Sequence, residues 1–489
     1  MQQGSVARAL ATNTMVQIVG KIVSTAIGVV VVGLMTRLLG QEGFGKYSTA
    51  NAFLQIFAIL MDLGLNVLLV QMLGEHAGDE KRERKIVRAF FTLRVVMAFV
   101  ILSIGVGIGF LIPAYDMDLK LAIAALWASF FFTLLNQVVV GVQQRHLKMH
   151  AVAVSEVAGR VVLLIGVLIA IAKGWGLIPV VLIVSLGGFV GFVINYIVAK
   201  RYADFGWDVD VAYWMMIIRR AWPIGVSIVF SLIYYKSDTL VLSWVRPQAE
   251  VGIYGAAYRV LEILVALPFM YAGVLLPLLA KAWKDRAQEH FRTLVQRSLD
   301  AMSLVTLPMV LGTQAVAIPL ISLMLGQEFA QSGDILRILI VAVGAIFLAV
   351  VFSHAVVALD AQKAMLPWYI CTAILAVAGY IFFIPTYGMW AAAWLTVASE
   401  VAILVGNIVV VIRHSGMRID FTVTGKALAA SLGMLAVAWI LTPYSLFLGI
   451  AGAVVTYAGL VFAFKAVTPE IIRELLKTGK GSPQGDASL

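Results

Sequence analysis

The chain has 489 residues, of which 62% are hydrophobic and only 13% are charged, and its formal net charge is +10. A soluble domain carries roughly 25% charged residues, so this composition excludes a soluble globular enzyme. The single cysteine, Cys371, excludes an internal disulfide. It lies in an apolar stretch, where a small buried side chain is the ordinary interpretation.

Apolar stretches long enough to cross a bilayer follow one another along the whole chain. A helix rises about 1.5 Å per residue and the hydrocarbon core is about 30 Å thick, so roughly 20 apolar residues span it. We therefore predict an all-α integral membrane protein with about fourteen transmembrane helices. The predicted spans lie near 10–32, 47–72, 89–112, 119–142, 151–172, 176–199, 220–244, 251–280, 298–325, 335–359, 364–385, 388–412, 422–441 and 445–466.

Lysine and arginine alternate between the connecting loops. The basic loops include 81–88, 145–148, 200–220, 281–297 and 413–426, whereas the intervening loops hold few basic residues. Basic loops stay in the cytoplasm, so we predict a multi-pass protein of the cell (inner) membrane with both termini cytoplasmic. The net charge is mainly this topological bias, and no nucleic-acid partner is predicted.

A short motif recurs in the two halves of the chain. Gly-x-Tyr-x-x-Ala begins at Gly45 and again at Gly252, an offset of 207 residues (252 minus 45). Six spans per half would make the halves parallel repeats, as in alternating-access transporters. We predict two six-helix bundles around a central cavity, two additional C-terminal helices and a disordered cytoplasmic tail, over residues 1–205, 206–415, 416–467 and 468–489 respectively.

Charges inside the spans are the candidate functional residues, because one at a helix centre costs about 2.5–3.5 kcal/mol to insert. Lys21, Lys236 and Asp62 have no opposite charge three or four residues away, which favours places in a polar cavity. We expect that cavity between the halves, lined by the first, second, seventh and eighth spans. A cationic cavity favours an anionic cargo such as a phosphate or diphosphate.

Other intramembrane charges have structural alternatives. Glu156 and Arg160 are four residues apart and are predicted to neutralise each other. Arg259 either faces the cavity or pairs with Glu262. Arg94 lies near a cytoplasmic helix end, where it can snorkel to the interface.

The site prediction combines cations, tyrosines and acids. The tyrosines suit stacking on sugar rings, although aromatic residues also populate bilayer interfaces. The acids would bind a coupling H+ or Na+, and beyond that ion no cofactor, metal site or catalytic residue is predicted. The predicted substrate-binding residues are Lys21, Arg37, Lys236, Arg259, Tyr235 and Tyr258, and the predicted ion-coupling residues are Asp62, Asp238 and Glu262.

Several segments resemble those of the polysaccharide transporter (Wzx-type) flippases, which belong to the multidrug/oligosaccharidyl-lipid/polysaccharide superfamily. The resemblance extends over nearly the whole chain, and the order and spacing of its motifs are more specific than each motif alone. The segments are Asn13-Thr14, Thr36-Arg37-Leu38-Leu39-Gly40-Gln41-Glu42-Gly43-Phe44-Gly45-Lys46-Tyr47, Asp62-Leu63-Gly64-Leu65, Tyr235-Lys236-Ser237-Asp238-Thr239-Leu240 and Val251-Gly252-Ile253-Tyr254-Gly255-Ala256-Ala257-Tyr258-Arg259, with Pro277 after it.

The resemblance implies two bundles in a V shape that flip a polyprenyl-diphosphate-linked oligosaccharide for cell-surface polysaccharide synthesis. Membrane lipids, a polysaccharide polymerase and glycosyltransferases are the candidate partners. A lipid II flippase is the alternative within this fold, although clustered arginines of that branch are missing at the start of this chain. A cation-coupled drug exporter is the second alternative. An enzyme is not expected, because the outer loops are too short to hold an active site.

Overall fold

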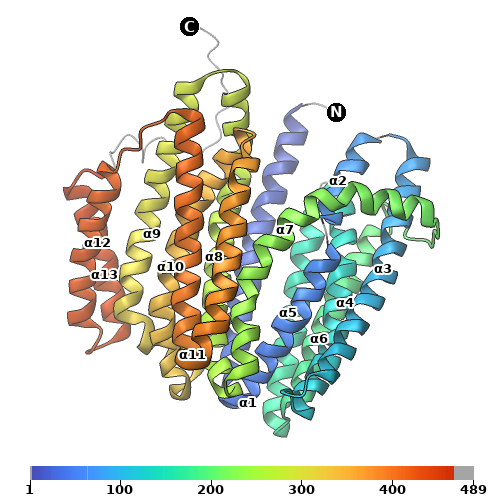
Figure 1. The fold of residues 1–489 in the computed structure, drawn as a ribbon, viewed down its shortest axis with the longest axis horizontal. Helices are drawn as coiled ribbons and strands as arrows, with labels where there is room; N and C mark the ends of the chain where they lie inside the picture. Colours follow the sequence, from blue (N-terminus) through green and yellow to red (C-terminus); the bar gives the residue numbers. More distant parts are fainter. Residues whose placement is uncertain (1–2, 63, 77, 147, 467–489) are drawn as a thin grey trace. The chain divides into compact units, whose positions relative to one another are not determined.

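The computed structural model describes residues 3–62, 64–76, 78–146 and 148–466, and gives only the backbone of 3–15, 18 and 223–235. Apolar spans must satisfy their backbone polar groups internally, which favours helices, and every regular element in the described part of the chain is a helix (Figure 1). The elements are α1 (Gln3–Asp62), α2 (Leu65–Glu75), α3 (Glu80–Leu111), α4 (Met117–Arg145), α5 (Met149–Lys173), α6 (Leu177–Ala199), α7 (Val211–Val245), α8 (Gln248–Lys284), α9 (Gln288–Leu325), the 3-10 helix η1 (Gln327–Phe329), α10 (Ala330–Ala358), α11 (Gln362–Ser415), α12 (Thr422–Leu441) and α13 (Leu446–Ala463).

The predicted all-α membrane architecture is confirmed. Among the described residues, 11 helical segments are long and apolar enough to cross a membrane. Two of them, of 57 and 54 residues, each cover two predicted spans. The number of spans itself stays a prediction.

Glycines make the sharp bends within the two longest helices. Gly40 in α1 has φ 64°, and Gly388 in α11 has φ 58°. These left-handed values strain any residue with a Cβ atom. A Cβ on Gly388 would also lie 1.8 Å from a carboxylate oxygen of Glu250. Glycine therefore lets each helix turn without an intervening loop.

The chain forms two compact units. Unit 1 contains Met1–Arg259, Ile321–Ile335 and Tyr369–Thr396, and unit 2 contains Val260–Leu320, Leu336–Trp368 and Val397–Leu489. The boundary at Arg259 falls inside α8. The predicted bundles over 1–205 and 206–415, the two additional helices over 416–467 and the tail over 468–489 stay predictions, and the tail lies wholly outside the described residues.

Helices α4, α5 and α6 form the packed body of unit 1, and glycines let two of them approach closely. A Cβ on Gly159 of α5 would lie 2.8 Å from the carbonyl oxygen of Gly187 of α6, and the reverse distance is 2.9 Å. Small residues at such crossings let membrane helices pack backbone against backbone. The polar side chains of α5 are thereby held beside α6.

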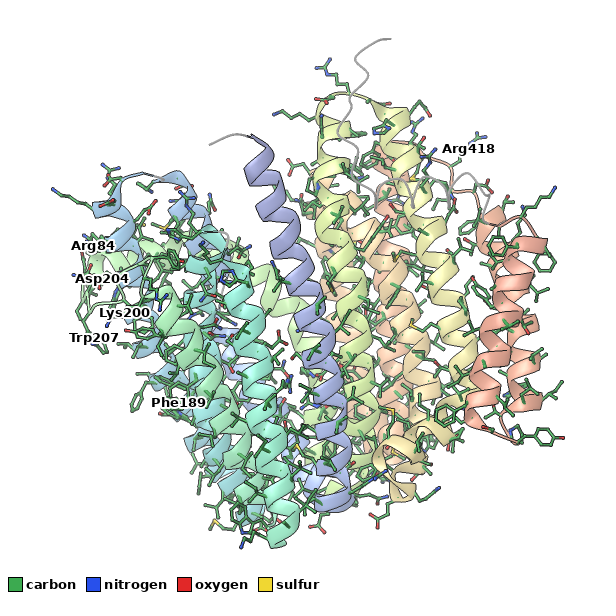
Figure 2. All side chains as sticks on the ribbon, turned by 180° about the vertical axis from the view of Figure 1, so that it is seen from behind. Arg84, Phe189, Lys200, Asp204, Trp207 and Arg418 are labelled. Carbon is green, nitrogen blue, oxygen red and sulfur yellow. The ribbon has the colours of Figure 1, made fainter. Side chains whose placement is uncertain are left out.

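One end of unit 1 carries many of its basic residues. Arg84 lies in the first turns of α3, Arg145 ends α4, and Lys200 follows α6. Figure 2 shows Arg84, Asp204 and Lys200 at this end and Phe189 further along the unit. We call this the basic end of unit 1.

The internal repeat appears in unit 1 as a reciprocal contact between α1 and α8. A Cβ on Gly45 would lie 1.7 Å from the carbonyl oxygen of Gln248, and a Cβ on Gly252 would lie 2.0 Å from that of Gln41. Gln41 and Gln248 are separated by the same 207 residues as the glycines (248 minus 41). The glycine of each repeat therefore packs against the equivalent backbone carbonyl of the other repeat, as at a local two-fold axis.

Within unit 2, α12 and α13 pack on each other and on α9. The Tyr457 hydroxyl of α13 donates to the carbonyl oxygen of Leu304 at 2.6 Å. Ala315, Met434, Ala438 and Ala453 form a small buried cluster between these helices. The C-terminal pair is thus an integral part of unit 2.

Candidate functional site

Lys21 does lie in a polar setting, but it has a partner from another helix. Its ammonium donates to the Glu156 carboxylate of α5 at 2.9 Å, and Ser24 donates to the same oxygen at 3.0 Å. The Lys21 and Glu156 side chains remain 49% and 33% exposed. The pair is therefore accessible to a ligand rather than sealed inside the protein.

The predicted pair between Glu156 and Arg160 is wrong. Glu156 turns to Lys21 instead, and the Arg160 guanidinium makes no ion pair or hydrogen bond within the described parts of the chain. It lies opposite α1, where a Cβ on Gly28 would be 3.7 Å from its Cζ atom. Arg160 is thus an exposed arginine inside a membrane span that does not pair with the nearest acid along its helix. Such a charge is unusual in a membrane-spanning helix.

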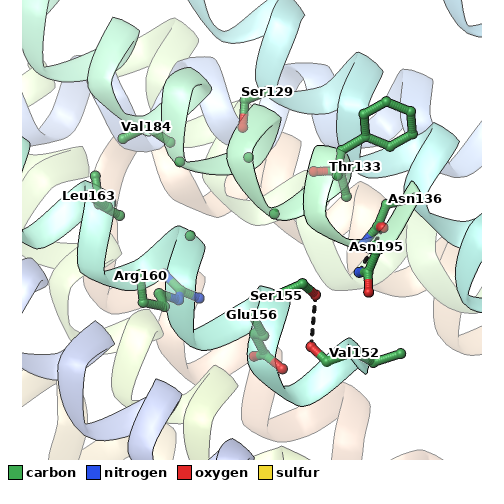
Figure 3. A pocket seen from close by; sticks show the side chains of 15 residues that line it. Ser129, Thr133, Asn136, Val152, Ser155, Glu156, Arg160, Leu163, Val184 and Asn195 are labelled. Carbon is green, nitrogen blue, oxygen red and sulfur yellow. Dashed lines mark hydrogen bonds between the residues drawn. The ribbon is translucent and has the colours of Figure 1, made fainter. Parts of the chain in front are cut away.

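Arg160 and Glu156 line a pocket of about 370 Å³ between α4, α5 and α6 (Figure 3). Hydroxyl and amide side chains form much of the rest of its wall. Asn195 donates to Asn136 at 3.0 Å, and the Oδ1 atom of Asn195 is buried without a partner in the described structure. The other polar lining residues are Ser129, Thr133 and Ser155. Such a pocket offers hydrogen bonds to hydroxyl groups beside a free cation.

Asp62 belongs to a different, buried network. Arg94 of α3 is 1% exposed, and its guanidinium donates to Asp62 and to the Gln137 amide oxygen, both at 2.7 Å. Arg94 does not snorkel to the interface, because the pair with Asp62 offsets the cost of its burial. The Nε and Nη1 atoms of Arg94 have no partner in the described structure.

Asp238 joins α7 to α8 and α11. Its carboxylate is 1% exposed and accepts from the Tyr254 hydroxyl at 2.5 Å and from the Thr396 hydroxyl at 3.4 Å. The backbone amide and hydroxyl of Thr239 donate to its other oxygen at 2.5 and 3.1 Å. The site prediction included Asp238 but missed Thr396, which follows it by 158 residues.

The structure brings two of the predicted site residues, Lys236 and Tyr258, into contact. The Lys236 ammonium lies over the Tyr258 ring at 4.5 Å, and the Arg259 guanidinium lies 5.8 Å from the centre of the Tyr47 ring. Both contacts have cation–π geometry. Tyr235 lies in α7, and its side chain is outside the described structure.

Arg37 lies far from these groups. It follows Lys21 by sixteen residues, or about 24 Å along one helix, and donates to the carbonyl oxygen of Leu323 at 2.7 Å. Neighbouring Thr36 donates to Leu325 at 3.1 Å. Arg37 thus links segments of unit 1 at the Gly40 bend and does not join Lys21.

Glu262 and Glu400, two of the acids within the predicted spans, lie in unit 2. Glu262 is half-buried. Glu400 of α11 is 6% exposed, and its carboxylate has no hydrogen bond or ion pair in the described part of the chain. A buried carboxylate without a partner is costly unless it takes up a proton. Sequence reasoning noted Glu400 as an intramembrane acid but did not include it in the site. The expected cavity between the halves stays a prediction.

The sequence matches two protein-family models. The polysaccharide biosynthesis protein model matches residues 10–283, and the MatE model matches residues 223–382. No curated protein matches the sequence.

The fold is similar to several solved structures. The lipid II flippase MurJ, in an inward closed conformation, has a TM-score of 0.76 at 14% identity, with 93% of this chain and 98% of that chain covered. An inward-facing multidrug resistance MATE family transporter of the MOP superfamily has a TM-score of 0.66 at 17% identity, with 82% and 97% covered. A MOP superfamily transporter from Pyrococcus furiosus has a TM-score of 0.59 at 15% identity, with 83% and 94% covered.

Proposed function

The chain belongs to the polysaccharide biosynthesis protein family, within the flippases and transporters of the MOP superfamily, and we propose that it flips a polyprenyl-diphosphate-linked oligosaccharide. The cargo moves from the cytoplasmic to the outer leaflet by alternating access. The observation that carries this proposal is Arg160, a guanidinium without a partner among the described residues, on a polar pocket inside the spans.

Arg160 binds the diphosphate of the cargo. A guanidinium presents parallel N–H donors that match the oxygens of a phosphate, and such charge-assisted bonds are the strong ones. The hydroxyl and amide groups of the same pocket, among them Thr133 and Asn136, bind sugar hydroxyls next to it. A drug cation would instead require an acidic pocket.

Lys21 is the second cation for the diphosphate. Its present partner, Glu156, is 2.9 Å away, and a phosphate oxygen competes with that carboxylate for the same ammonium. Lys236 and Arg259 provide further cations on α7 and α8, each beside a tyrosine ring. In this proposal the anionic cargo contacts the four cations in succession.

The function is tested by flipping in proteoliposomes. Arg160→Gln should slow the flipping of a defined diphosphate-linked oligosaccharide at least tenfold, because a hydrogen bond to a charged group contributes about 1.5–3 kcal/mol. The control is Arg418→Gln, which removes an exposed arginine from a connecting loop of unit 2. Unchanged flipping by Arg160→Gln would remove the main support for the proposal.

Lipid II is the second candidate cargo, because the similarity to the MurJ structure covers 93% of this chain. Lipid II also carries a diphosphate, so Arg160 does not distinguish the two cargoes. Parallel assays with both lipids do so, and faster flipping of lipid II would favour the peptidoglycan precursor.

Membrane potential or an ion gradient drives transport, and ATP does not. Outward movement of about two negative charges gains roughly 4–5 kcal/mol per 100 mV when the inside is negative. Protonation or Na+ binding at Asp238, Glu262 or Glu400 assists the return step. Vesicles with an imposed potential, pH gradient or Na+ gradient, and no nucleotide, should flip faster than vesicles without a gradient. Equal rates in all of them would indicate passive equilibration.

The basic end of unit 1 faces the cytoplasm, as basic loops do. Single cysteines at Gly78 and Gln288, in a Cys371→Ala background, should resist an impermeant thiol reagent in intact cells. Cysteines at Gly174 and Gln248 should react with it. Permeabilised cells provide the control for intrinsic reactivity. Labelling of Gln288→Cys from outside would overturn this orientation.

A further inference from the structure

A second cavity, separate from the pocket of Arg160, lies at the basic end of unit 1. It measures about 450 Å³ and is formed by the start of α3, the end of α4 and the segment 200–204 that follows α6. Basic and acidic side chains both line it, so its charge depends on which of them are already paired. The charged lining residues are Glu80, Glu83, Arg84, His146, Lys200, Arg201 and Asp204.

Two of the three acids are neutralised by arginines. Asp204 accepts from Arg88, and this bond lowers the pKa of the Asp204 carboxyl, which therefore stays ionised at neutral pH. Glu83 lies 3.7 Å from the Arg145 guanidinium. The cations Arg84, Lys200 and Arg201 have no side-chain hydrogen bond or ion pair in the described structure. The cavity thus keeps three uncommitted cations against one uncommitted acid, Glu80.

Aromatic rings support one wall of the cavity. The His146 ring lies 5.5 Å from the Tyr202 ring, and its Nδ1 atom donates to the carbonyl oxygen of Val142 at 3.0 Å. The Lys148 ammonium lies over the Tyr202 ring, 5.7 Å from its centre, and adds a further positive charge nearby. His146 is therefore held in place, with its Nε2 atom directed away from the α4 backbone.

Apolar side chains continue from the cavity toward the membrane. Trp207 is 69% exposed, and Val209 and Val211 follow it on the same segment with 69% and 64% exposed. Figure 2 shows Lys200, Trp207 and then Phe189 in succession along one side of unit 1. Phe189 precedes Lys200 by eleven residues, or about 16 Å along the helix. Tryptophan is typical of the headgroup level, and an exposed phenylalanine further in faces acyl chains.

We propose that this cavity binds the phosphate of an anionic glycerophospholipid of the cytoplasmic leaflet. Arg84, Lys200 and Arg201 bind the phosphate oxygens, and the acyl chains descend beside Trp207 toward Phe189. Free phosphate shares the headgroup chemistry but cannot use the apolar contacts. The proposed lipid site is independent of the cargo, which binds in the pocket between α4, α5 and α6.

Native mass spectrometry of the full-length protein in detergent tests the proposal, with dioleoyl phosphatidic acid as the probe and dioleoyl phosphatidylcholine as the neutral lipid. The double variant Lys200→Gln/Arg201→Gln should bind phosphatidic acid about 30-fold more weakly, as expected for the loss of two basic residues near an anionic surface. The double variant Arg413→Gln/Arg418→Gln makes the same charge change on exposed residues of unit 2 and should stay within about threefold.

Three further measurements separate this site from its alternatives. Inorganic phosphate at the concentration of the lipid should not displace phosphatidic acid, and displacement would identify a free-phosphate site instead. Phosphatidylcholine should bind both double variants and the unmodified protein equally. An equal loss of affinity for phosphatidic acid in the two double variants would overturn the proposal, because it would show an effect of net charge alone. Unchanged thermal melting of both variants verifies that they are folded.

Discussion

Gly45→Ala is expected to destabilise the protein by about 1–3 kcal/mol, the usual cost of an extra group forced into a packed contact, and to reduce flipping more than tenfold. The added Cβ would lie 1.7 Å from the Gln248 carbonyl oxygen. That oxygen belongs to the backbone, so the clash cannot be relieved by a side-chain rotation. Helices α1 and α8 must move apart instead.

Gly252→Ala should have a similar effect, because its Cβ would lie 2.0 Å from the Gln41 carbonyl oxygen. The double variant should lose less stability than the two single variants lose together, because one separation of the helices relieves both clashes. Gly107→Ala is the control, because no atom lies within 4 Å of its Cβ position. Thermal melting and flipping are measured on all four proteins. If Gly45→Ala melts and transports as Gly107→Ala does, the crossing is not as tight as described.

Asp62→Leu is expected to destabilise the protein by about 3–5 kcal/mol, the cost of removing one partner of a buried ion pair. It leaves the Arg94 guanidinium, which is 1% exposed, with the Gln137 amide oxygen as its remaining hydrogen-bond acceptor in the described structure. Adding Arg94→Met should restore much of the stability, because an apolar pair of similar volume has no charge to bury. Melting temperatures of the two single variants and the double variant give the coupling between the residues.

The double variant also tests the predicted ion-coupling role of Asp62. If the carboxylate only holds Arg94 in place, the Asp62→Leu/Arg94→Met protein should still respond to an imposed pH or Na+ gradient. A stable protein that flips without any gradient dependence would instead support coupling through Asp62. Wild-type vesicles at the same protein density provide the reference rate.

Apolar length, loop charge and short motifs were sufficient to predict the helical membrane fold and the family. The pairing of the intramembrane charges was not predictable in the same way. Spacing within one helix detects neighbours three or four residues apart, whereas Lys21 and Glu156 are 135 residues apart and Arg94 and Asp62 are 32 apart. Because Glu156 turns to Lys21, Arg160 is left without the acid that its spacing suggested.

The pocket of Arg160 could have been suspected from its amides. Asn136 and Asn195 are amide residues within otherwise apolar stretches, and such residues are rare in lipid unless they meet a partner or a cavity. Their contact at 3.0 Å joins α4 to α6 through two residues that are 59 positions apart. Which of the possible partners an amide chooses depends on helix rotation, which a single sequence does not specify.

The reciprocal crossing of α1 and α8 also bears on how such a chain can diverge after duplication of a half-length gene. In a dimer of two identical halves, each contact across the crossing would occur twice. One substitution would therefore change both copies of the contact. In the present chain the glycines are the same in both repeats, but Ser48 corresponds to Gly255 (48 plus 207). A Cβ on Gly255 would lie 2.6 Å from the Ser48 hydroxyl oxygen. The serine of one repeat thus occupies the space where the other repeat has no side chain. Such a difference is possible only when the two repeats have separate sequences, and identical subunits of a dimer cannot adopt it.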